Sequence, residues 1–248
     1  MNYIAELKYP GTFISHQDRD WIFRIQNLLF LLDSSLIDAV IALILFEQAR
    51  NSGAEITKAK WQFKNEEISK IEHELDQINP VENFDFQAKQ LQRERARILF
   101  MRKEIENGIF PENYRSRLVF IYAKSFLYSL DRIDKLFNVL KDEQGVSAGI
   151  SLTHKKFVSS FPNLRSVRNS SAHIEDRIRG VVRNKPMPNG NSIELENLNN
   201  NSFSSIMEDG NIGEVEVSFE SIISVRDCIQ EVIDSFQWSG PPRLSPLY

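Results

Sequence analysis

The fold is decided by the longest helical pattern in the chain, residues 18–50: DRDWIFRIQNLLFLLDSSLIDAVIALILFEQAR. Apolar side chains recur in this stretch every three or four residues rather than at every second residue, which predicts one long helix. The serine pair 34–35 is the place where a kink in this helix would fall. The residues Asn51-Ser52-Gly53 supply a stop signal directly after it.

The same stretch raises the question of a membrane span. Residues 28–46 are apolar over about the length that a bilayer needs, but Asp33 and Asp38 interrupt them, and an ionised group at the bilayer centre costs several kcal/mol. We therefore expect a buried helix and no membrane contact. The first ten residues lack the pattern of a signal peptide. Because the single cysteine, Cys228, has no internal disulfide partner, the sequence predicts a protein of the reducing cytoplasm.

Two charge-dense segments follow, residues 56–79 and 82–107, and Asn79-Pro80 separates them. They are predicted to form an antiparallel helical hairpin, or arm. This arm is interpreted either as a solvated projection or as a coiled-coil-like surface for dimerisation or partner binding. The apolar residues that would form its inner stripes are Trp61, Ile68, Ile71, Leu75 and Ile78 in the first segment and Leu91, Ile98, Met101 and Ile105 in the second.

The rest of the chain predicts a mainly α fold, an up-and-down helical bundle in a single domain over residues 1–238. Helices are expected at residues 111–145, 151–161, 163–179 and 219–236, with a small antiparallel β meander at 190–219 and a flexible tail at 239–248. The helix that begins at Pro111 has the most core-like apolar face of the chain.

Charge is distributed unevenly along the chain. The net formal charge is −4, yet residues 151–186 contain eight basic and two acidic side chains, whereas residues 187–248 contain two basic and ten acidic ones. The basic block offers a local site for phosphates on an acidic protein, although such a block also occurs as an ordinary solvated surface. His154 in this block is expected to be exposed at a helix start.

Within the basic block lies Arg168-Asn169-Ser170-Ser171-Ala172-His173. An arginine, an amide and a histidine supply what RNA cleavage without metal requires, namely a cation for the phosphorane charge, a hydrogen-bonding group and a group that titrates near neutral pH. On a helix, Asn169 and His173 share one face, while Arg168 lies about 140° away from His173. All three converge only through a long side chain or a site built from two chains.

This string resembles the Arg-x(4 to 6)-His signature of HEPN domains (higher eukaryotes and prokaryotes nucleotide-binding), in which Asn, Asp or His typically follows the arginine. The resemblance implies a helical bundle that homodimerises with two motifs facing one cleft. It also implies a metal-independent endoribonuclease that leaves a 2′,3′-cyclic phosphate and a 5′-hydroxyl. Such domains occur in toxin-antitoxin and antiviral systems, so an antitoxin or regulatory protein is an expected partner. The long arm and the meander depart from the usual pattern.

The sequence thus predicts a site without a metal or other cofactor. We expect His173 to act as general base or acid, Arg168 to stabilise phosphorane charge, and Asn169 to orient the phosphate or the imidazole. Arg165 and Arg177 are expected to flank the groove of a homodimer and bind RNA. The alternative is a noncatalytic helical scaffold whose arm recruits a partner.

Overall fold

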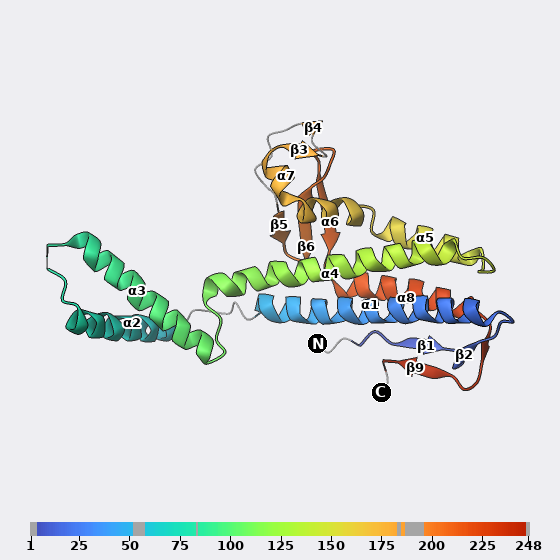
Figure 1. Cartoon of the computed structure of the whole chain (residues 1–248), viewed down its shortest axis with the longest axis horizontal. Helices are drawn as coiled ribbons and strands as arrows, with labels where there is room; N and C mark the ends of the chain where they lie inside the picture. The colour runs from blue at the N-terminus through green and yellow to red at the C-terminus, as the bar shows by residue number, and fades with distance from the viewer. Residues whose placement is uncertain (1–3, 52–57, 83, 183–184, 187–195, 247–248) are drawn as a thin grey trace. The chain divides into compact units, whose positions relative to one another are not determined.

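The computed structural model describes residues 4–51, 58–82, 84–182, 185–186 and 196–246 (Figure 1). These residues form eight helices and small antiparallel sheets, which confirms the prediction of a mainly α fold. Their contacts divide the chain into two compact units, the first formed by residues 1–47 and 120–248 and the second by residues 48–119. The sequence had predicted a single domain with an arm at 56–107.

The first unit is built from long helices whose apolar stripes face one another. They are α1 (Arg19–Asn51), α4 (Glu112–Lys141), α5 (Gly149–Ser160) and α8 (Phe219–Asp234), of which α1 and α4 also have residues in the second unit. The side chains of Leu36, Phe126 and Ile229 are among those with no exposed surface, so each of α1, α4 and α8 contributes to the core. The sequence periodicity predicted these helices within a few residues of their ends.

Helix α1 continues through its serine pair, where the hydroxyls of Ser34 and Ser35 donate to the carbonyls of Phe30 and Leu31 four residues earlier. By length and composition α1 is apolar enough to cross a membrane, and half of its most apolar window is buried inside the protein. The absence of membrane contact therefore stays a prediction.

Both ends of the chain join the first unit through paired strands. Strand β1 (Leu7–Tyr9) pairs with β9 (Arg243–Ser245), and β2 (Phe13–Ile14) pairs with β8 (Trp238–Ser239), all antiparallel. Residues 239 and 243–245 of the predicted tail at 239–248 therefore lie in paired strands, and the flexibility of the tail stays a prediction. The buried Asp33 carboxylate of α1 accepts hydrogen bonds from the Tyr9 hydroxyl (3.3 Å) and the Ser245 hydroxyl (2.6 Å). Burial, with help from this carboxylate, raises the pKa of Tyr9.

The predicted meander is confirmed as a three-stranded antiparallel sheet of β5 (Glu196–Asn199), β6 (Ser202–Ile206) and β7 (Ile212–Glu216) in that order. Buried Phe203 in the middle strand stands opposite Leu198 on one side and Val215 on the other. The predicted strand residues 193 and 195 lie outside the described residues. A short antiparallel pair precedes the sheet, formed by the two-residue strands β3 (Val181–Val182) and β4 (Lys185–Pro186).

The second unit contains the predicted helical hairpin, α2 (Lys58–Ile78) and α3 (Phe86–Glu106) (Figure 1). The Asp85 side chain caps α3 by accepting from the backbone N–H of Ala88, which satisfies one of the free donors of the first turn. Ile68 of α2 packs with two residues of α3, Ala96 and Phe100, in a small apolar core.

The face that α3 turns toward α2 differs from the predicted one. The buried residues of α3 are Gln92, Ala96 and Phe100, whereas Leu91, Ile98 and Ile105 of the predicted inner stripe are exposed. Alanine in the middle of the buried face leaves room for the Ile68 side chain, and an ion pair from Lys103 to Glu67 (3.7 Å) links the two helices. The hairpin therefore leaves a second apolar stripe of α3 without a partner within the described residues.

Candidate active site

The predicted helix 163–179 is two helices, α6 (Leu164–Ala172) and α7 (Ile174–Ile178), and His173 forms the joint between them. The backbone of His173 leaves the helical region (φ −122°, ψ 44°), although its N–H still donates to the Asn169 carbonyl at 3.0 Å. The prediction of one continuous helix is therefore wrong at the residue that the motif depends on. The break leaves the His173 side chain exposed.

Asn169 and His173 line the same small cavity, as their four-residue spacing predicted. The cavity has a volume of about 190 Å³, and polar and charged side chains dominate its wall. Strand β3 and the turn after β6 close it from the side of the sheets. The lining residues are Asn169, His173, Asp176, Arg177, Val182 and Glu208.

Arg177 is the cation beside Asn169 and His173 within one chain. Its side chain is buried, with Nε donating to the Ser170 hydroxyl (3.3 Å) and Nη1 donating to the Val181 carbonyl (3.1 Å). These bonds connect α6, α7 and β3. That Arg165 and Arg177 flank the groove of a homodimer and bind RNA stays a prediction; Arg165, on the first turn of α6, is exposed.

Arg168 points to helix α4 rather than into the cavity. Its Nη2 donates to the Asp131 carboxylate at 2.8 Å, and the same carboxylate accepts from Lys135 at 2.7 Å. The Nε of Arg168 is buried and has no hydrogen-bond acceptor among the described residues. One chain therefore brings Asn169 and His173 together and holds Arg168 apart from them, in agreement with the angular separation expected on a helix.

A second polar contact fixes the motif helix to its surroundings. The Ser171 hydroxyl of α6 donates to the Glu196 carboxylate of β5 (2.7 Å), which also pairs with Lys124 of α4 (2.6 Å). The Glu196 side chain is largely buried, so this triad links α4, α6 and the sheet. Sequence reasoning missed Glu196 because no local pattern connects it to residues 25 and 72 positions earlier.

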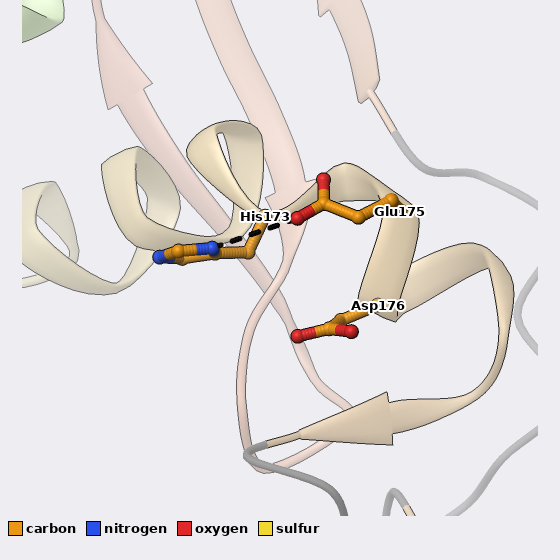
Figure 2. A group of neighbouring side chains, drawn as sticks. All are labelled: His173, Glu175 and Asp176. Atoms are coloured by element: carbon orange, nitrogen blue, oxygen red, sulfur yellow. Dashed lines mark ion pairs between the residues drawn. The ribbon is translucent and has the colours of Figure 1, made fainter.

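Three groups near the cavity could ligate a cation. One ligand atom each from His173, Glu175 and Asp176 lies within 4.8 Å of the others, and the His173 Nδ1 is 3.7 Å from the Glu175 carboxylate. Figure 2 shows both carboxyl groups directed toward the side of α7 on which His173 lies. Imidazole and carboxylate ligands suit several divalent metals. Since His173 and Glu175 are exposed, the cluster alone does not indicate an ion, and a site without metal stays a prediction.

His154 is buried, contrary to the expectation of an exposed residue. Its Nε2 is 2.8 Å from the Asp134 carboxylate of α4, and its ring lies against Phe137. The pair joins α5 to α4 through a polar contact inside the first unit. It takes no part in the cavity lined by Asn169 and His173.

Comparisons of this chain with family models, with curated proteins and with solved structures find no match.

Proposed function

We propose that this protein is a HEPN-like, metal-independent endoribonuclease that cleaves RNA by attack of the ribose 2′-hydroxyl. The observation that carries the proposal is the shared cavity, where the exposed imidazole of His173 and the amide of Asn169 lie beside the buried Arg177 guanidinium. An imidazole that can accept or donate a proton, next to a hydrogen-bonding amide and a cation, is suited to phosphoryl transfer.

In the proposed reaction the 2′-oxygen attacks phosphorus and the 5′-oxygen leaves. One histidine accepts the proton of the 2′-hydroxyl and an acid supplies a proton to the 5′-oxygen, so the products are a 2′,3′-cyclic phosphate and a 5′-hydroxyl. Asn169 orients the phosphate or the imidazole. Arg168 stabilises the phosphorane charge in this proposal, which requires more of its guanidinium to be accessible than its contact with Asp131 allows.

The separation of Arg168 from His173 supports a site built from two chains. A twofold homodimer brings two histidines to one cleft, so that one acts as base and the other as acid, and it adds the exposed Arg165 of each chain to the RNA surface. Mixing wild-type protein with an equal amount of the inactive His173→Ala variant tests this arrangement. If the cleft needs the histidine of both chains, only wild-type dimers cleave, and random mixing leaves about one quarter of the activity of the same amount of wild-type protein. About one half would show that each chain works with its own histidine.

The central experiment compares wild-type protein with His173→Ala on a labelled RNA in EDTA. Loss of an acid or base lowers the cleavage rate by about 10²- to 10⁴-fold. The matched control is His73→Ala, since His73 is an exposed histidine of α2 that bonds only to Gln77 among the described residues. Cleavage that His173→Ala leaves unchanged, or products with a 3′-hydroxyl, would overturn the proposal.

The proposed biological setting is the bacterial cytoplasm, as a toxin or an antiviral nuclease held in check by an antitoxin or regulatory protein. Toxicity on expression, abolished by His173→Ala, is the expected result. Growth inhibition that persists in this variant would argue against a nuclease toxin.

A noncatalytic scaffold is the second candidate, and the contacts of Arg168 and Arg177 favour it. Arg168 bonds to Asp131 and Arg177 bonds to Ser170 and Val181, so both cations already stabilise the fold. A scaffold without catalytic function keeps its cellular activity when His173 is replaced, whereas the nuclease loses it.

A further inference from the structure

Helix α3 carries an apolar stripe that its partner α2 does not cover. Leu91, Ile98 and Ile105 are spaced by seven residues and are 50%, 47% and 42% exposed. The residues of α3 that face α2 are Gln92, Ala96 and Phe100. We name Leu91, Ile98 and Ile105 the outer seam.

The seven-residue spacing of the outer seam matches one of the two apolar positions of a coiled-coil heptad, while Glu94 and Met101 stand at the other. Seven residues at about 100° each fall about 20° short of two full turns, so the three side chains form a nearly straight stripe that a second helix follows by gentle supercoiling. Ile98 and Phe100 are two residues apart and therefore about 160° apart around the helix. The outer seam and the hairpin core thus occupy opposite faces of α3, and a further helix can pack on the seam while the hairpin stays intact.

An apolar groove in the second unit is lined by residues of α2, of α3 and of the chain that follows α3. It has a volume of about 860 Å³, and Met101, three residues after Ile98, is part of its wall. Trp61 and Phe63 of α2 also line the groove and are mostly exposed. Exposed apolar surface of this extent usually marks an interaction site rather than ordinary surface.

The charges beside the outer seam decide what it can bind. Arg95 and Arg102 lie on one flank, both exposed and without an ion-pair partner in the described part of the chain. The other flank holds Arg97 and Glu104, and Glu94 lies between Leu91 and Ile98. Two copies of α3 in parallel would place Arg102 opposite Arg97, and two antiparallel copies would place Arg95 opposite Arg102. Like charges at these positions disfavour a second copy, whereas acidic residues on a different helix would complement the arginines.

We propose that the outer seam binds an amphipathic helix of a partner protein, with apolar residues at heptad spacing and Asp or Glu at the flanking positions. The apolar positions pack on Leu91, Ile98 and Ile105, and the acidic positions pair with Arg95 and Arg102. This inference is independent of the nuclease proposal, because it uses only residues of the second unit.

Two fluorescent peptides of about four heptads test the proposal against the full-length protein. Both have Leu at the apolar heptad positions; one has Glu and the other Lys at the flanking positions. We expect the Glu peptide to bind and Ile98→Asp to weaken its binding by about ten- to a hundredfold, since a buried apolar side chain is replaced by a charge. The control is Ile41→Asp, an isoleucine of α1 with similar exposure outside the seam.

Charge reversal separates the proposed occupant from others. The double variant Arg95→Glu/Arg102→Glu should prefer the Lys peptide, and circular dichroism of each variant shows whether the helices are retained. Failure of the Glu peptide to bind wild-type protein overturns the proposal. So does a dimer, seen by light scattering, that Ile98→Asp dissociates, since the occupant is then a second copy. Binding of oligouridylate that needs Arg95 and Arg102 but tolerates Ile98→Asp would show a nucleic-acid surface instead.

Discussion

Replacing Asp131 by asparagine removes the charge that holds Arg168 on helix α4. The Asp131 side chain is 5% exposed and that of Arg168 is 16% exposed, so water replaces little of the lost attraction. Asparagine keeps the shape of the side chain and one acceptor oxygen but leaves the guanidinium without a counter-charge. The second cation, Lys135, is mostly exposed and its loss contributes little.

The expected cost follows from these exposures. Removing one partner of a fully buried ion pair lowers the free energy of unfolding by about 3–5 kcal/mol. The hydrogen bond that asparagine can still accept from the charged guanidinium restores about 1.5–3 kcal/mol of this. We therefore expect Asp131→Asn to lower the free energy of unfolding by about 2 kcal/mol. For a chain of this size that corresponds to a fall in Tm of about 4–8 °C.

The assay is urea and thermal unfolding followed by circular dichroism, with Asp38→Asn as the matched control. Asp38 is 56% exposed and lies 3.7 Å from Arg132, so its replacement should cost less than about 1 kcal/mol. A double-mutant cycle with Arg168→Met should give a coupling of at least about 1 kcal/mol. If Asp131→Asn is no more destabilising than Asp38→Asn, or if its effect adds to that of Arg168→Met, the contact between Asp131 and Arg168 does not hold α6 on α4.

Three further predictions concern other parts of the chain. RNA cleavage should persist in EDTA; its loss in EDTA and return with Mn²⁺ would instead show that the cluster of His173, Glu175 and Asp176 binds a metal required for catalysis. Burial raises the pKa of the Cys228 thiol to about 11, so about one molecule in a thousand is ionised at pH 8 and labelling by a thiol reagent should require unfolding; rapid labelling of native protein would contradict this. Phe100→Ala should destabilise the hairpin by about 3 kcal/mol and Leu91→Ala by less than about 1 kcal/mol, measured by urea unfolding, and equal costs would show that the buried face of α3 is assigned wrongly.

The sequence predicted the helices well because their apolar periodicity is a local signal. It failed on the orientation of α3, where two stripes of similar apolar content compete. Leu91, Ile98 and Ile105 are all aliphatic, whereas the buried face holds Gln92, Ala96 and Phe100; Ala96 allows α2 to pack closely and so determines the buried face. The terminal strands were missed for a different reason, since β1 and β9 pair across more than 230 residues and are too short to leave a pattern of their own.

The same difference between local patterns and contacts of distant residues applies to the candidate site. The contact of Asn169 and His173 with one cavity follows from a spacing of four residues, which any helix turns into a shared face. The orientation of Arg168 depends on Asp131, 37 positions away, and could not be read locally. The contact with the buried carboxylate of Asp131 thus keeps Arg168 apart from His173 of the same motif. For this reason the proposed chemistry requires either a rearrangement that breaks the contact with Asp131 or a second chain whose histidine approaches Arg168. Mixing wild-type protein with an equal amount of His173→Ala distinguishes the two, since about one half of the activity remains in the first case and about one quarter in the second.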